Sequence, residues 1–204
     1  SRIGITAGSR GIKDIAIILK TIIDLLRDLE AKPFVFPSMG SHGGATAEGQ
    51  KQVLAEYGIT EASMGVPICS SMDIIEIGKT QKGTPVLMDR YAVEADGLVV
   101  VNRIKPHTKF KAPLESGLFK MMVIGMGKHQ GAQYYHQAAI QQGIYPILLE
   151  AGKLILSKCP ILFGVGIVEN AYDESALIEA ILPCEFFQRE QKLLEEAKKR
   201  MPKI

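Results

Sequence analysis

Short apolar runs alternate along the chain with longer segments whose apolar positions recur at helical spacing. The runs at 3–6, 33–37, 98–104 and 161–168 predict buried strands. Apolar residues at positions 15, 18, 19, 22, 23, 26 and 29 predict an amphipathic helix over 12–30. Further helices are predicted at 46–57, 131–144, 146–157, 175–180 and 186–200, with a loop at 59–71 that has room for one helical turn and a short link at 91–95.

A β-hairpin interrupts this alternation. Residues 73–78 and 84–89 alternate around Lys82-Gly83, and their polar side chains favour a peripheral position. The strand at 98–104 opens with four consecutive apolar residues, so we expect it in the middle of the sheet. The predicted fold class is therefore α/β, a three-layer sandwich with a mostly parallel sheet and an inserted β-hairpin.

Composition narrows the class of protein. With 204 residues, of which 47% are hydrophobic, the chain suits one domain with a sizeable core. A net charge of only +2 and the absence of Trp argue against a nucleic-acid partner. No signal peptide and no long uncharged apolar run is present, so we expect a cytoplasmic protein with no membrane partner.

The cysteines and the chain ends add two expectations. Cys69, Cys159 and Cys184 are widely spaced and form no C-x-x-C, which favours buried thiols in a reducing compartment. The first residues resemble a strand already under way. We therefore expect the chain to be a piece of a longer protein, and a homo-oligomer is compatible with the sequence.

Histidines gather in or near turns that follow apolar strands. His107, His129 and His136 lie between Val101 and Gln137. Pro106 disfavours the helical conformation at the residue before it, so the chain should stay extended up to His107.

The fourth histidine, His42, lies in a glycine-rich turn between the strand at 33–37 and a helix with Thr46 as N-cap and Gly58 as C-terminal stop. Gly49 leaves that helix without a capping box. Open α/β sheets bind ligands at such joints. A histidine that only caps the turn is the alternative.

The first strand leads through Ala7-Gly8-Ser9-Arg10-Gly11 into the first predicted helix. A helix N-terminus after a glycine turn presents N–H groups to an anion, and Arg10 could add a bidentate phosphate contact. The other interpretation is an ordinary turn with a capping serine.

Lys120 is the polar residue in the apolar stretch 118–124. Desolvation would lower its pKa and make its amine a better nucleophile, unless the side chain snorkels to the surface. Gly125 and Gly127 predict a flexible turn, with His129 just before the next helix and His136 two turns into it. A helical histidine suits a metal, although no pair has the spacing of H-E-x-x-H.

These motifs together resemble a known family. The chain carries Ser9-Arg10, Met39-Gly40-Ser41-His42, Lys105-Pro106-His107, Gly117-Leu118-Phe119-Lys120 and the helical His136 in the order of the lactate racemase family. These are the nickel-pincer-nucleotide-dependent racemases and epimerases. The resemblance covers nearly the whole chain, matches the N-terminal cofactor-binding domain, and is strongest to an uncharacterised branch with N-R-[IV]-K-P-H-T and E-S-G-L-x-K.

The resemblance implies a cofactor and a set of roles. The cofactor would be the nickel-pincer nucleotide, pyridinium-3,5-bisthiocarboxylate mononucleotide nickel. Its lysine attachment, nickel ligand, phosphate contact and two proton-transferring histidines have matches in this chain. The expected roles are cofactor binding by Ser9, Arg10 and Lys120, nickel ligation by His136, and catalysis by His42 and His107. His129 has no counterpart and is expected to face solvent or lie behind the site residues.

The implied reaction is racemisation or epimerisation of a 2-hydroxy acid. The C2 proton of such an acid is hard to remove, because the neighbouring carboxylate makes the carbanion unstable. Transfer of hydride to a cofactor carbon, while a histidine takes the hydroxyl proton, avoids the carbanion. Inversion then requires a base on each face, and histidine has the necessary pKa without tuning.

Two other functions are compatible with the sequence. A zinc hydrolase could hold a metal-bound water with His42, His107 and His136. A binding module could keep the fold and lack the chemistry. The family resemblance also implies a second, C-terminal domain that covers the site, so we expect residues 1–204 to be a single cofactor-binding domain of a two-domain protein. The interval from His107 to Lys120 is longer than in lactate racemase.

Overall fold

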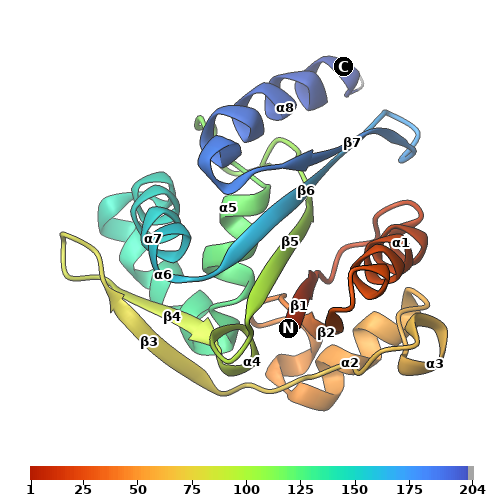
Figure 1. Ribbon diagram of the computed structural model, residues 1–204. Helices are drawn as coiled ribbons and strands as arrows, with labels where there is room; N and C mark the ends of the chain where they lie inside the picture. Colours follow the sequence, from red (N-terminus) through yellow and green to blue (C-terminus); the bar gives the residue numbers. More distant parts are fainter. Residues whose placement is uncertain (202–204) are drawn as a thin grey trace.

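A five-stranded sheet in the order β2-β1-β5-β6-β7 forms the centre of the computed structural model, which describes residues 1–201 (Figure 1). Four strands run parallel, and β7 pairs antiparallel with β6 at one edge. The strands are β1 Arg2–Ala7, β2 Lys32–Pro37, β5 Gly97–Arg103, β6 Ile161–Glu169 and β7 Ser175–Ile181.

Both faces of this sheet are covered by helices, which gives the predicted three layers. Along β5, Leu98 and Val100 pack into one apolar core, and Val99 and Val101 pack into the other. Successive side chains of a strand point to opposite faces, so a strand buried on both faces needs a continuous apolar run. The fold class and the central position of β5 are confirmed.

The helices divide between the two faces (Figure 1). On one face lie α1 Ile15–Asp28, α2 Ala47–Glu56 and α3 Glu61–Met64. On the other lie α5 Leu118–Lys120, the π-helical turn η2 Met121–Gly125, α6 Lys128–Gln142, α7 Ile144–Lys158 and α8 Phe186–Arg200. The short turns are η1 Gly43–Ala45, α4 Arg90–Val93 and η3 Pro183–Glu185.

The inserted hairpin is also confirmed. Strands β3 Ile74–Lys79 and β4 Pro85–Asp89 pair antiparallel in a separate two-stranded sheet. It packs beside α6 and α7, where the Lys158 ammonium donates to the Ile77 carbonyl at 3.0 Å. The Thr46 N-cap is confirmed as well, since its hydroxyl accepts from the Gly49 N–H at 3.0 Å.

The helix predicted at 175–180 is wrong. These residues form β7, which pairs with β6 from Ser175 to Ile181. A tight turn precedes it, in which the Asn170 N–H donates to the Glu174 carbonyl at 2.9 Å. Ala, Leu and Glu favour helix locally, but pairing with the exposed edge of β6 outweighs that preference.

Several boundaries differ from the prediction. The first helix begins at Ile15 rather than at position 12, because Asp14 has φ 58° and interrupts the helical conformation, while the Lys13 N–H donates to Glu169 at 2.9 Å. Helix α6 begins at Lys128, so His129 lies inside its first turn rather than before it. The link predicted at 91–95 is mostly the helical turn α4.

The glycines at 125 and 127 do not form the flexible turn expected. A Cβ on Gly125 would lie 2.6 Å from the Ser38 carbonyl oxygen, and one on Gly127 would lie 2.6 Å from the Val123 carbonyl oxygen. Both positions therefore serve close backbone packing.

The thiol prediction was partly wrong. Cys184 is exposed, whereas Cys69 and Cys159 are half-buried.

Among residues 1–201, no helix has the length and apolar character needed to cross a membrane.

The strand order creates a switch point at the carboxyl edge of the sheet. From β1, the chain moves first to β2 on one side and later to β5 on the other. The loops that follow these three parallel strands therefore meet at one edge. Crevices of this kind are where open α/β sheets bind ligands.

A buried carboxylate joins α8 to the start of α5. Glu190 Oε2 accepts the N–H of Phe119 at 3.0 Å, and the N–H of Leu118 also donates to this carboxylate. A Cβ at residue 117 would lie 2.3 Å from Glu190 Oε1, so only glycine fits there. Burial raises the pKa of Glu190 from 4.5 to about 7, although the backbone N–H groups oppose the shift.

We expect this carboxylate to make stability depend on pH. Its folded pKa exceeds its unfolded pKa, so the stabilisation is present below pH 4.5 and is lost as pH rises through about 7. Urea unfolding at several pH values should show the free energy of unfolding of Glu190→Gln rising, relative to the unaltered protein, by about 3 kcal/mol over this range.

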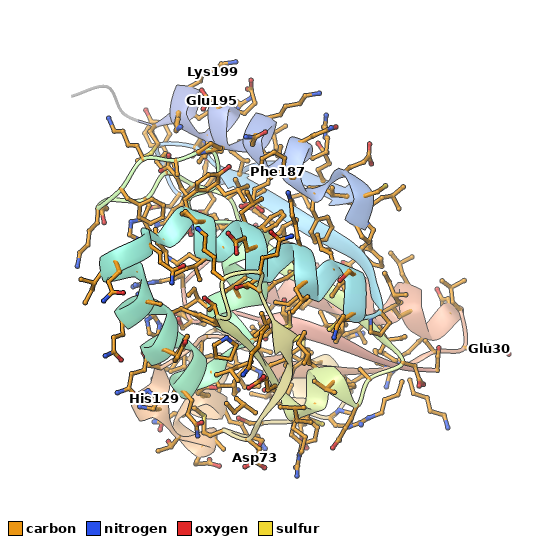
Figure 2. All side chains as sticks on the ribbon, turned by 90° about the vertical axis from the view of Figure 1, so that its left-hand side faces the viewer. Glu30, Asp73, His129, Phe187, Glu195 and Lys199 are labelled. Carbon is orange, nitrogen blue, oxygen red and sulfur yellow. The ribbon has the colours of Figure 1, made fainter. Side chains whose placement is uncertain are left out.

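Glu195→Gln is the matched control, because Glu195 is an exposed carboxylate of the same helix (Figure 2) that pairs with Lys198 at 3.0 Å. Surface ion pairs contribute about 0–1 kcal/mol. A difference between Glu190→Gln and the unaltered protein that stays constant with pH would contradict the expectation.

Candidate functional site

The loop after β1 is tied to the loop after β2. Ser9 Oγ is hydrogen-bonded to Nδ1 of His42, and the Ser9 carbonyl accepts the Tyr57 hydroxyl at 3.0 Å. Ser9 therefore does not act as a helix cap, and α1 has no side-chain cap at all. Its hydroxyl can accept from an Nδ1–H, which leaves Nε2 of His42 free to take up a proton.

The loop after β2 is hydrogen-bonded to the end of β1 and to Gly125 in η2. The Ser38 N–H donates to the Ala7 carbonyl at 2.8 Å, and the Gly40 N–H donates to the Gly125 carbonyl at 3.2 Å. Gly40 has φ 59°, a conformation that favours glycine. The backbone is buried up to Gly40, and His42 then emerges at the surface.

The loop after β5 folds over a buried carboxylate. Lys105 and Ser116 exchange backbone hydrogen bonds at 2.9 and 3.3 Å, which closes the loop at its base. Inside it, Glu115 accepts the His107 N–H at 2.6 Å and lies 3.3 Å from the Lys198 ammonium on α8. This carboxylate fixes the backbone of His107.

The imidazole of His107 is oriented within the same loop. Nδ1 accepts the Lys109 N–H at 3.1 Å, and the ring stacks on Phe110 with centroids 4.3 Å apart. An acceptor at Nδ1 means that the neutral ring carries its proton on Nε2. In this geometry His107 can donate from Nε2, and it can accept there only after the Lys109 contact opens.

Lys120 and His136 come from the segment that follows. Lys120 ends α5, half-buried between Phe119 and Met121, and its amine has no ion pair among residues 1–201. Burial lowers the pKa of Lys120, and the charges of Arg10 and Lys105 lower it further. The direction is the one that the apolar surroundings led us to expect.

The charge of Lys120 reaches all three candidate histidines. Partial burial is the largest cause that lowers the pKa of His42, followed by Arg10 and then Lys120. Burial followed by Lys120 also lowers the pKa of His107 and of His136. The structure thus brings together side chains from loops far apart in sequence, while their roles stay predictions.

The other charges that act on the histidines differ. Arg10 acts on His42, whereas Lys109 lowers the pKa of both His107 and His136. His129, by contrast, is exposed at the start of α6 (Figure 2).

The arrangement is not that of a three-ligand metal site. Within residues 1–201, no group of three or more His, Cys, Asp or Glu side chains is spaced to hold a metal ion. Two open hollows of about 400 and 370 Å³ lie elsewhere, between β7 and α8 and between α2 and α3.

Two residues near the site were assigned no role from the sequence. Lys105 adds its charge to Lys120, and burial followed by Arg103 and Arg10 lowers the pKa of Lys105 itself. Glu115 positions His107. Both stand inside the motifs Lys105-Pro106-His107 and E-S-G-L-x-K, so the motifs held the signal, but their contacts depend on the folded loop.

A family model described as "Lactate racemase N-terminal domain" matches residues 8–144, well over half of the chain. The chain belongs to this family. The matched residues include Arg10, Lys120 and the four histidines described above. No curated protein matches the chain in sequence.

The lactate racemase apoprotein of Thermoanaerobacterium thermosaccharolyticum has a similar structure, with a TM-score of 0.67 and 18% sequence identity. The match covers 94% of this chain and 48% of that one, so the chain spans about half the length of this lactate racemase. At this identity the likeness shows the fold that the lactate racemase N-terminal domain adopts.

We expect Lys120→Met to raise the pKa of His42, His107 and His136 together. A positive charge disfavours an imidazolium, so its removal makes protonation easier. Arg10→Gln should raise the pKa of His42 among the three and leave the other two unchanged. Titration of the imidazole resonances by NMR measures each value.

Lys111→Met is the control, since it removes an exposed lysine from the loop after β5. It should leave all three histidine pKa values in place. If Lys120→Met moved none of them, the amine would not lie among the histidines.

Proposed function

We propose that this chain is the cofactor-binding domain of a nickel-pincer-nucleotide-dependent racemase or epimerase of a 2-hydroxy acid. One observation carries the proposal beyond family membership. Lys120, a half-buried amine, carries a positive charge that acts on His42, His107 and His136. A lysine that anchors the cofactor must lie near the histidine that ligates the metal and near the two histidines that transfer protons.

The chemistry of these side chains fits the cofactor. Arg10 is exposed and forms no ion pair within residues 1–201, and its charge and that of Lys105 crowd the same region. A phosphate held by Arg10 and Lys105 would relieve this repulsion. Lys120 would form the covalent link, and His136, on the rigid helix α6, would ligate nickel.

When bound, the cofactor would supply a carbon that takes hydride from the substrate and returns it. The residues of the chain then handle the hydroxyl proton. With Nδ1–H donated to Ser9, His42 accepts this proton at Nε2, and its lowered pKa keeps it neutral and ready at pH 7. Ser9 thereby orients the base, in addition to the cofactor contact expected of it.

His107 is suited to the opposite step. Its Nε2–H can donate to the substrate oxygen while Nδ1 stays on the Lys109 N–H. Racemisation needs one imidazole that accepts and one that donates at any moment, and the two hydrogen-bond patterns supply one of each. In the reverse direction the contact between the Lys109 N–H and Nδ1 must open, while Glu115 keeps the backbone of His107 in place.

The proposal extends to the longer protein. Residues 1–204 would form one cofactor-binding domain of a two-domain protein located in the cytoplasm, with a small 2-hydroxy acid as substrate. The zinc hydrolase has no specific support, because His42, His107 and His136 are not grouped as three ligands in the described part of the chain.

The test separates attachment from nickel ligation. In cells that make the cofactor, the protein should carry a covalent adduct and bound nickel, measured by intact mass and elemental analysis. Lys120→Ala should lose the adduct. His136→Ala should keep the adduct and lose nickel, because the link and the metal ligand are different side chains.

His129→Ala is the matched control, since it removes an exposed histidine of the same helix and should change neither reading. Zinc without an adduct would support the hydrolase. A protein with neither metal nor adduct would indicate a binding module, provided that replacing each of the four histidines by alanine leaves ligand binding unchanged.

A further inference from the structure

A fully buried lysine lies between the residues of the proposed site. Lys128 opens α6 with φ 55° and is 0% exposed. It follows Lys120 and precedes His136 by the same number of residues. Its backbone therefore belongs to the segment that carries both site residues, while its side chain leaves that segment and enters the protein interior.

Three oxygen atoms surround the Lys128 ammonium. It donates to the Pro37 carbonyl at 2.8 Å and to Gln50 Oε1 at 2.7 Å, and it lies 3.1 Å from Asp89 Oδ2. The Pro37 and Gln50 oxygens accept hydrogen bonds, whereas Asp89 Oδ2 makes an ion pair with the ammonium. These oxygens come from the end of β2, from α2 and from the end of β4.

Gln50 passes this contact on to the loop of His42. Its Nε2 donates to the Gly40 carbonyl at 2.9 Å and to the His42 carbonyl at 3.2 Å. Gln50 is itself 0% exposed, so water cannot replace these bonds. One amide thus joins the lysine to the backbone of the proposed base.

Asp89 supplies the countercharge. It is also 0% exposed, its Oδ1 accepts the Tyr91 N–H at 2.7 Å, and its own N–H donates to the Met126 carbonyl at 2.7 Å. Within residues 1–201, Asp89 Oδ2 contacts Lys128 through this ion pair and accepts no hydrogen bond. A lysine without this carboxylate would be an unpaired buried charge.

We propose that Lys128 and Gln50 are positioning residues, which hold the loop of His42 in a fixed place relative to Lys120 and His136. A buried ion pair contributes little net stability compared with apolar residues of the same size, but it defines a position well. Here it links the backbone of one half of the site to the segment that carries the other half. The role in catalysis rests on the proposed function, whereas the positioning does not.

Gln50→Leu is the direct test. It leaves the Lys128–Asp89 pair and the Pro37 contact in place and removes both bonds to the loop. The imidazole should then leave Ser9 and the charges of Arg10 and Lys120. By NMR on the cofactor-free protein, the pKa of His42 should rise towards its ordinary value, with those of His107 and His136 unchanged.

Hydrogen exchange gives a second reading. The His42 N–H donates to the Met39 carbonyl at 3.2 Å within the loop. Its exchange should become about tenfold faster in Gln50→Leu, the factor expected when roughly one ordinary hydrogen bond no longer holds a loop closed.

Tyr135→Phe is the matched control. Its buried hydroxyl, also on α6, accepts the Leu87 N–H at 2.9 Å and has no bond to the loop of His42. It should leave both readings unchanged. A folded Gln50→Leu with the same His42 pKa and exchange rate as the unaltered protein would overturn the proposal.

If Gln50→Leu does not fold, Gln50→Glu is the second variant. A carboxylate at this position still accepts from Lys128 but has no N–H for the two carbonyls. Faster exchange of the His42 N–H is again expected, and an unchanged rate contradicts the proposal.

Measurements on protein that carries the cofactor distinguish this proposal from the proposed function. Gln50→Leu should keep the Lys120 adduct and nickel, and should lower kcat with KM little changed. Absence of the adduct from the unaltered protein would defeat the proposed function alone, since the NMR readings do not depend on the cofactor.

Discussion

The parallel pairing of β1 with β2 on one side and β5 on the other is the constraint on which the site depends. It places the ends of three strands at one edge, so the loops that carry Arg10, His42 and His107 meet there. Helix α6 then carries His136 within reach of the charge of Lys120. The sheet needs apolar residues on both faces to stay central, and the chemistry is left to the loops, which tolerate polar residues.

Crowded positive charge is the second property of this edge. Arg10, Lys105 and Lys120 lie close enough to affect one another, and burial removes some of the water that would screen them. A protein accepts such repulsion where an anionic ligand compensates it. A phosphate and a substrate carboxylate are both anions, so the charge pattern agrees with the proposed cofactor and with an acid as substrate. Burial, followed by nearby charges that include Lys120, lowers the pKa of the three imidazoles and favours the neutral form, which accepts a proton.

Local sequence predicted the parts of the fold that depend on local pattern. The strand β5 was found because burial on both faces leaves an unbroken apolar run. Strand β7 was missed, because its residues favour helix and only the edge of β6 makes them extended. For the proposed site, motif order selected His42, His107 and Lys120, and their roles stay predictions. The bond between Ser9 and His42, and the partners of Lys128, join residues far apart in sequence, and no spacing rule could have predicted them.

Three segments of the proposed site are each held by a buried ionisable side chain. Glu115 fixes the backbone of His107, Glu190 holds the helical turn that ends at Lys120, and Lys128 reaches the loop of His42 through Gln50. Apolar contacts could stabilise these loops equally well, but they are non-directional and would allow several positions. Hydrogen bonds between a buried polar side chain and backbone groups are directional, so they hold the loop in a single position. Since proton transfer requires donor and acceptor within hydrogen-bond distance, a site assembled from separate loops depends on such fixed backbones.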